Sequence, residues 1–234
     1  MSSVDLAASL IRAGQANVIV AGGMESMSQA PYVLPKARNG YRFGNGTLLD
    51  AMQSDALNDV YGGYPMGITA ENINDKYQIT RHQQDEFALM SHQRAVKAQK
   101  AGYFDSEIVP VEVKQKRTTV TVTVDEAPRP DTSLAALAKL KPAFKSDGSV
   151  TAGNASGIND GGAALVLASE SAVNRLGLTP LAEWQGSAVV GLDPALMGLG
   201  PYYAIKKLLK NQQLSADDVD TYEINEAFAT QALV

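Results

Sequence analysis

The sequence of 234 residues contains no cysteine. This absence excludes a disulfide-stabilised scaffold and a zinc site built on thiolates. It also excludes a cysteine nucleophile among these residues. Basic residues are outnumbered, with 20 Lys and Arg against 25 Asp and Glu. Because nucleic-acid-binding proteins normally present a basic patch, this balance argues against a nucleic-acid partner.

Long hydrophobic runs are missing as well. No apolar run approaches the ~20 residues that a membrane-spanning helix needs. Asp5 and Arg12 interrupt the only apolar stretch near the N-terminus, so the pattern of a signal peptide is absent. We therefore expect a cytoplasmic protein without membrane contact. With 45% apolar residues and modest charge, the chain has enough material for a real core, which excludes general disorder.

Hydrophobic periodicity predicts a chain of mixed helices and strands. Helices are expected over residues 3–14, 80–101 and 201–210 and between 168 and 176, and strands over 18–21, 118–124, 163–168, 184–190 and 218–224. The strands at 18–21 and 163–168 are continuous apolar runs, typical of strands buried on both faces of a parallel sheet. Thr80 and Gln83 have the spacing of a capping box at the start of the longest helix.

Residues 151–162 form a segment of small side chains with four glycines. Such a segment lets a ligand approach the backbone and leaves Ser156 free to donate a hydrogen bond. No lysine follows it, so it is not a Walker loop, and it precedes a strand, so it is not a dinucleotide fingerprint. A ligand loop and an ordinary tight connection into a strand are equally compatible with this composition.

Asn225 lies at an elbow between the strand expected at 218–224 and a helix expected to begin at residue 226. Asparagine is a favoured helix N-cap, which gives it a purely structural role. A carboxamide at such an elbow can alternatively hold a water molecule or a developing oxyanion. His82 and His92 are ten residues apart and do not have the i, i+4 spacing of a metal-binding pair, so no metal site is expected.

Several motifs together resemble the thiolase family, in family order and across essentially the whole chain. They are VIVAGGMESMS (Val18–Ser28), MGITAEN (Met66–Asn72), IVPVEV (Ile108–Val113), VTAGNASGINDGGAA (Val150–Ala164), MGLGP (Met197–Pro201) and NEAFA (Asn225–Ala229). The resemblance implies an α/β fold of thiolase type, with layers in the order αβαβα and an inserted α+β loop domain. It places parts of the N-terminal domain at 1–27 and 159–177, the loop domain at 28–158, and the start of a truncated C-terminal domain at 178–234.

The resemblance also implies a chemistry. Members of the family join two molecules of acetyl-CoA by Claisen condensation, or cleave a 3-ketoacyl-CoA with coenzyme A, through an acylated cysteine. By resemblance, Asn225 belongs to the catalytic set and helps to hold the thioester oxyanion through a water molecule. The family's nucleophilic cysteine would lie upstream of Met1, and its histidine and second cysteine beyond Val234. We therefore expect both termini to cut through domains and the chain alone to be inactive.

The remaining site residues are also implied by the resemblance. The channel for the pantetheine arm and its acyl end involve Leu57, Met66, Phe144, Ala152, Ala155, Ser156, Ala227 and Phe228, and the nucleotide end involves His92 and Arg129. His92 stands where the family is expected to carry glutamine. Lys139, Lys141 and Lys145 add positive charge near the loop. No cofactor is expected, since the coenzyme A thioester is the substrate, and the complete protein is expected to form a homodimer or homotetramer.

A non-catalytic acyl-CoA-binding or assembly protein derived from a thiolase is the alternative. A third interpretation, independent of the family, is an α/β domain with a glycine-rich ligand loop.

Overall fold

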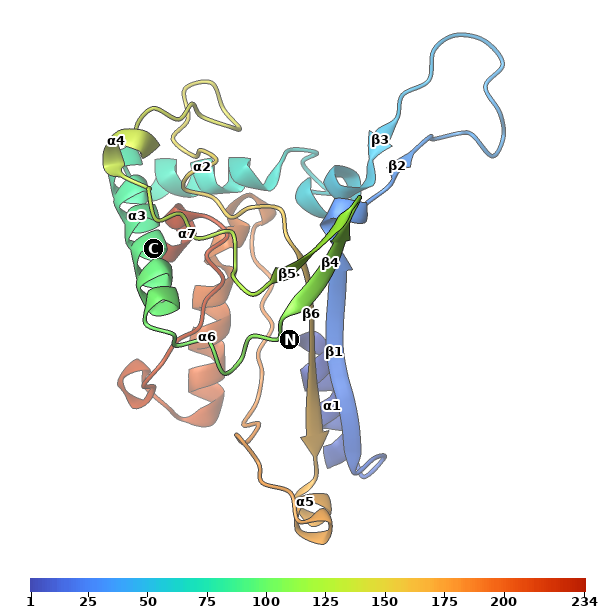
Figure 1. The fold of residues 1–234 in the computed structure, drawn as a ribbon, viewed down its shortest axis with the longest axis vertical. Coiled ribbons are helices and arrows are strands. Elements are labelled where there is room, and N and C mark those ends of the chain that lie inside the picture. The colour runs from blue at the N-terminus through green and yellow to red at the C-terminus, as the bar shows by residue number, and fades with distance from the viewer. The chain divides into compact units, whose positions relative to one another are not determined.

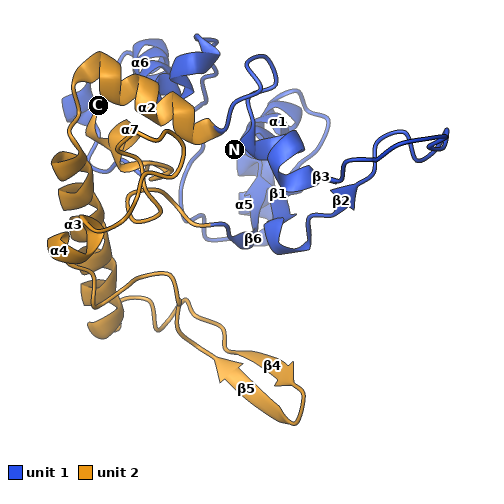
Figure 2. Cartoon of the chain, turned by 90° about the horizontal axis from the view of Figure 1, so that it is seen from above, with its two compact units in different colours: residues 1–65, 158–223 blue, residues 66–157, 224–234 orange.

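The computed structural model describes residues 1–234 as two compact units, which Figure 2 distinguishes by colour. Unit 1 comprises residues 1–65 and 158–223, and unit 2 comprises residues 66–157 and 224–234. Each unit is therefore built from two separate parts of the chain.

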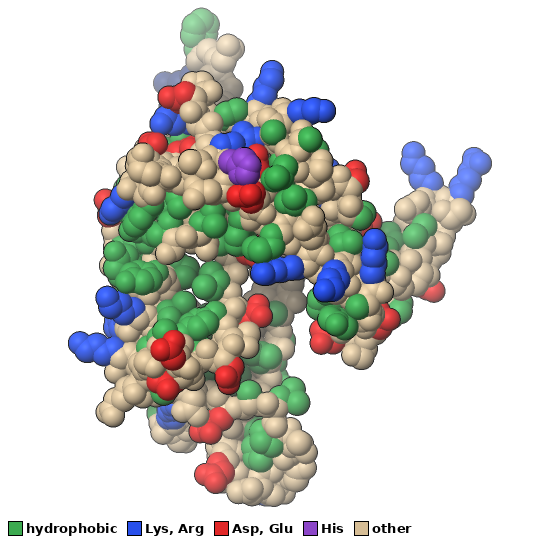
Figure 3. Space-filling view, turned by 90° about the vertical axis from the view of Figure 1, so that its left-hand side faces the viewer, with side chains coloured by type: hydrophobic (Ala, Val, Ile, Leu, Met, Phe, Trp, Pro, Cys, Tyr) green, Lys and Arg blue, Asp and Glu red, His purple; other side chains and the backbone are tan.

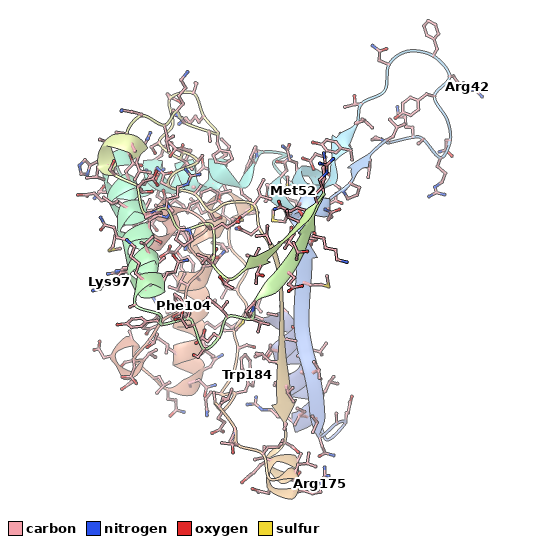
Figure 4. All side chains as sticks on the ribbon, viewed as in Figure 1. Arg42, Met52, Lys97, Phe104, Arg175 and Trp184 are labelled. Carbon is pink, nitrogen blue, oxygen red and sulfur yellow. The ribbon has the colours of Figure 1, made fainter.

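An antiparallel ribbon is the centre of unit 1. Strands β1 (Val18–Ser26) and β6 (Asp160–Ala168) pair over their whole length, with Val18 opposite Ala168 and Ser26 opposite Asp160. Helix α1 (Ser2–Arg12) packs against both strands, as Figure 1 shows. Its buried side chains meet Ala21 of β1 in a small core, against which Trp184, labelled in Figure 4, also packs.

The prediction of strands buried on both faces of a parallel sheet is wrong. Both strands form, but they are antiparallel, and each has only one neighbour. Val20 is 70% exposed and Val166 67% exposed, whereas Ala21 is buried. The reason is that a continuous apolar run predicts an extended segment but carries no information about the direction of its partner or the number of covering layers.

The strands predicted at 184–190 and 218–224 do not form. A strand needs a neighbouring strand that bonds to its backbone. In the first segment, side chains bond to backbone carbonyls instead: Arg12 donates to the carbonyls of Trp184 and Gln185. Lys207 likewise donates to the carbonyl of Val189 at 2.8 Å. The second segment follows a 3₁₀ turn at Ala216–Asp218, which has Ser215 as its N-cap residue.

The rest of unit 1 consists of short elements and one longer helix. They are a 3₁₀ turn at Met27–Gln29, β2 (Tyr32–Val33), β3 (Leu49–Asp50), a π-helical turn at Gln53–Leu57, α5 (Glu170–Leu176), a 3₁₀ segment at Pro194–Leu199 and α6 (Gly200–Gln212). The connection from β2 to β3 carries Arg42, labelled in Figure 4. Pro201 occupies the first turn of α6, as the sequence predicts.

Unit 2 is built on helices. They are α2 (Met66–Tyr77), α3 (Arg81–Lys100), α4 (Leu134–Leu137) and α7 (Ala229–Leu233), and a hairpin of β4 (Val111–Gln115) and β5 (Thr118–Val122) projects from them (Figure 2). The predicted capping box at the start of α3 is confirmed. Helix α7 contacts both α2 and α3.

The core of unit 2 joins segments that are distant in sequence. Ala70 of α2, Val150 and Phe228 are buried together. The partly buried side chains around them are Met66, Ala155 and Ala227. No helix of the chain is sufficiently long and apolar to cross a membrane.

Candidate functional site

A short backbone pairing in unit 2 brings together the two segments that the sequence singles out. Ala155 and Phe228 form an antiparallel bridge. On either side of it, the amide of Ser156 donates to the carbonyl of Ala227 and the amide of Ala229 donates to the carbonyl of Asn154, both at 2.9 Å. The glycine-rich segment and the elbow after Asn225 are thus held side by side, although about 70 residues separate them in sequence.

Two aromatic rings form a wall at this pairing. The rings of Phe144 and Phe228 meet edge to face, with centroids 6.2 Å apart and planes at 80°. Phe144 lies directly against Gly67 of α2, where an added Cβ would come within 2.1 Å of the ring. Only glycine therefore allows this position of Phe144. Met66, adjacent to that glycine, packs on the same core.

Asn225 has its side chain exposed at the edge of this wall. The helix that follows begins at Ala229, with Phe228 as its N-cap residue, not at residue 226. Asn225 therefore does not cap the helix, and the structural role considered for it is wrong. The physical reason is that the pairing with residues 154–156 keeps residues 227 and 228 extended. Its exposed carboxamide is available to a ligand or a water molecule.

Ser156 and Ala152 are also exposed on the glycine-rich segment. The backbone amide of Ser156 is used in the pairing, so the hydroxyl group is the part that can donate to a ligand. Ala152 offers no side chain beyond a methyl group. Together they form a surface of small groups against which an elongated ligand can lie close to the backbone.

His92 and Arg129, expected at a nucleotide end, are adjacent. The backbone amide of Arg129 donates to Nδ1 of His92 at 3.2 Å. An open groove of about 320 Å³ lies along this side of α3, lined by Gln93, Val96, Lys97, Lys100, Arg129, Pro130 and Thr132. Lys97 is labelled in Figure 4. Lys97 and Lys100 of α3 therefore line the same groove as Arg129.

One of the lysines expected to add charge near the loop takes part in an ion pair. Lys145 pairs with Asp75 at 3.5 Å between two exposed side chains. Such exposed pairs contribute little to stability. On the face drawn in Figure 3, basic side chains occur in several separate groups with hydrophobic side chains between them.

A buried polar network supports the site, and no pattern in the sequence predicts it. Glu71 and Asn74 of α2, Gln84 and Asp85 of α3, and Asn154 of the loop are all at least 95% buried. They bond to one another or to Ser149 and its neighbours. The bonds that join the helices to residues 149–154 span 65 to 79 residues along the chain, so local patterns could not have identified them.

Two further predictions concern Leu57 and metal binding. Leu57 belongs to unit 1, whereas the other predicted site residues belong to unit 2. No group of three or more metal-ligating side chains is present. In unit 1, Asp160 at the end of the glycine-rich segment accepts hydrogen bonds from the hydroxyl group (2.5 Å) and the amide (2.9 Å) of Ser28. These bonds hold the pKa of its carboxyl group below the ordinary value.

Comparison with known proteins gives a consistent result. The sequence profile described as thiolase, N-terminal domain matches residues 1–171, and that of the thiolase C-terminal domain matches residues 178–234. An acetyl-CoA acetyltransferase of Chromobacterium violaceum is 52% identical over the whole chain, and a probable acetyl-CoA acyltransferase of Staphylococcus epidermidis is 50% identical. The chain spans 60% of the length of the first and 59% of the second.

Solved structures agree with the sequence comparison. The acetyl-CoA acetyltransferase of Bacillus anthracis superimposes with a TM-score of 0.94 at 49% identity, over the whole chain and 59% of that protein. Human mitochondrial 3-ketoacyl-CoA thiolase gives the same TM-score at 46% identity, over 99% of this chain and 59% of that one. The thiolase-type α/β fold predicted from the motifs is confirmed, and the chain belongs to the thiolase family.

Proposed function

We propose that this chain is the substrate-binding part of an acyltransferase that uses coenzyme A thioesters. The proposed reaction is the condensation of two acetyl-CoA molecules to acetoacetyl-CoA, or the reverse thiolysis, through an acylated cysteine. The observation that carries the proposal is the pairing of residues 154–156 with 227–229, which brings Ser156 beside the elbow that bears Asn225. The names of the similar proteins support the same substrate class.

The residues of unit 2 suit the parts of such a substrate. In this proposal the pantetheine arm lies along the small side chains at 152–156 and accepts a hydrogen bond from the hydroxyl group of Ser156. Phe144 and Phe228 form one apolar wall, with Met66 towards the acyl end. Asn225 holds a water molecule that donates to the thioester oxygen as negative charge develops there.

The nucleotide end of coenzyme A is proposed to lie along α3. Arg129, Lys97 and Lys100 line the groove there and supply positive charge for phosphate groups. Because these side chains are exposed, their attraction is screened by salt. His92 fixes the backbone at Arg129 through the bond to its amide.

The proposed reaction passes through an acylated cysteine, and the 234 residues contain none. We therefore propose that this chain alone catalyses neither condensation nor thiolysis, because loss of a catalytic nucleophile removes most of an enzyme's rate enhancement. The proposed reaction uses no cofactor besides the thioester substrate. A cytoplasmic location and a homodimeric or homotetrameric complete protein are part of the same proposal.

Calorimetric titration of coenzyme A tests the binding site directly. We expect a dissociation constant no better than about millimolar, weakening at high salt. Ser156→Tyr should abolish binding, because the ring fills the surface of small groups. Ser106→Tyr, at an exposed position of unit 2 after α3, is the matched control and should leave binding unchanged. Tight binding that is indifferent to Ser156→Tyr would place the site elsewhere.

A further inference from the structure

One residue pair holds the first of the two segments in the pairing of residues 154–156 with 227–229. Only two backbone hydrogen bonds hold the segments together. The second segment is fixed by the burial of Phe228 and by the hydroxyl group of Thr230, which donates to Oδ1 of Asn74 at 2.6 Å. Ser156 and Asn225 keep their relative position only if the first segment is fixed as well.

Asn154 fixes the first segment. Its side chain is 4% exposed. Its amide group donates to Oδ1 of Asp85 at 3.0 Å and to the carbonyl of Ser149 at 3.2 Å. Its oxygen accepts from the amide of Thr151 at 2.7 Å. Both ends of the carboxamide are thus engaged, so the side chain cannot rotate without breaking all three bonds. The carbonyl that accepts from Ala229 belongs to this same residue.

Asp85 connects Asn154 to α3. The carboxylate is also 4% exposed, and it accepts from Nε of Arg81 at 2.8 Å in addition to Asn154. Arg81 in turn donates to the carbonyl of Leu137 at 2.6 Å. The position of Asp85 is therefore fixed by its own helix and by the segment at 137.

The same helix also holds the other side of the elbow. Ser91, six residues after Asp85, donates to the carboxylate of Glu226 at 2.6 Å. Glu226 directly follows Asn225. Helix α3 therefore holds the elbow twice, through Asp85 and Asn154 at Ala229 and through Ser91 at Glu226. Asn225 lies beside the second contact.

We propose that Asp85 and Asn154 are positioning residues that set the location of Asn225 relative to Ser156. Neither side chain reaches the surface at which the substrate is proposed to bind, so both act through the backbone pairing. The inference rests on the proposed function, in which Ser156 and Asn225 both act on the bound substrate. Loss of the Asp85–Asn154 pair leaves the side chains of Ser156 and Asn225 unchanged but alters the position of one relative to the other.

A general stabilising role is the competing explanation, and hydrogen exchange distinguishes the two. Amides that open only with the whole unit exchange together, whereas amides released locally exchange faster than the rest. The amides of Ser156 and Ala229 report the pairing. The amide of Ile73, in the buried middle of α2, reports unfolding of unit 2.

The test uses the whole chain with Asn154→Ala, and with Asp85→Asn as an isosteric second variant. Asp85→Asn keeps one acceptor but cannot accept from both Arg81 and Asn154. We expect exchange at Ser156 and Ala229 to accelerate roughly 10- to 100-fold relative to Ile73 in Asn154→Ala, with a smaller change at the same amides in Asp85→Asn. Glu86→Gln, an exposed carboxylate on α3, is the control and should change nothing.

The outcomes separate this inference from the proposed function. Equal acceleration at all three amides, or none at Ser156 and Ala229, would overturn the positioning role. If Asn154→Ala does not fold, Asp85→Asn decides by the same comparison. Coenzyme A affinity should fall at least tenfold in the variants that loosen the pairing, and unchanged affinity would overturn the inference. Failure of the unmodified chain to bind coenzyme A would instead refute the proposed function while leaving the exchange result intact.

Discussion

Glu71→Gln should destabilise unit 2 strongly, because every partner of this carboxylate is a donor. The side chain is 4% exposed. Oε1 accepts from the amides of Ser149 and Val150, both at 2.8 Å. Oε2 accepts from the hydroxyl group of Ser149 at 3.1 Å and from the amide of Asn74 at 3.3 Å. A glutamine would have to turn its own NH₂ group towards one of these two sets of donors.

The hydroxyl group of Ser149 cannot compensate. It already accepts from Asn74 at 2.9 Å and from Gln84 at 3.0 Å, so both lone pairs are occupied and its proton points at Glu71. The variant loses two hydrogen bonds to a charged acceptor, each contributing about 1.5–3 kcal/mol, and buries an unsatisfied donor. We expect the free energy of unfolding of unit 2 to fall by about 3–5 kcal/mol.

Urea unfolding with two probes measures this effect. The single tryptophan, Trp184, lies in unit 1, so its fluorescence reports that unit alone. Far-UV circular dichroism follows α2 and α3 of unit 2 in addition. Glu86→Gln, an exposed carboxylate 3.2 Å from His82, is the matched control and should change stability by no more than about 0.5 kcal/mol. A loss below about 1 kcal/mol for Glu71→Gln would refute the reasoning.

Two further predictions follow from single contacts. Gly67→Ala should lower the free energy of unfolding of unit 2 by about 1–3 kcal/mol, because the added Cβ overpacks a buried position against the Phe144 ring. It should also weaken coenzyme A binding measured by calorimetry, since the ring must move away from Phe228. Ser28→Ala should raise the pKa of Asp160 in a carboxyl NMR titration, and an unchanged pKa would contradict the assigned bonds. Because the folded pKa is depressed, the stability difference between the two chains should be full at neutral pH and disappear as the pH falls below about 4.

Local features of the fold could be predicted from the sequence. The capping box at Thr80 joins residues three apart, so their spacing in the sequence is enough to predict it. The same holds for Pro201 in the first turn of α6. The motifs that resemble the thiolase family predicted the fold class, which the solved structures confirm.

Features that depend on distant partners could not be predicted from local patterns. The apolar run at Val18 predicted a strand, but its antiparallel pairing with Ala168 depends on a segment about 150 residues away. Asn225 has the sequence position of a helix cap, and only the pairing of Phe228 with Ala155 moves the helix start to Ala229. The motifs named the residues of the candidate site, whereas Glu71 and its network became visible only in the structure.

The contacts of bound acetyl-CoA test the central claim most directly. The claim is that unit 2 binds a coenzyme A thioester along residues 152–156, with the acyl group towards Met66. NMR with acetyl-CoA carrying a ¹³C-labelled methyl group measures nuclear Overhauser effects from that methyl group to the protein. Effects to the side chains of Met66 and Phe228 are the predicted result. Effects only to residues of unit 1, such as Leu192 and Tyr203 in its apolar hollow, would contradict the account.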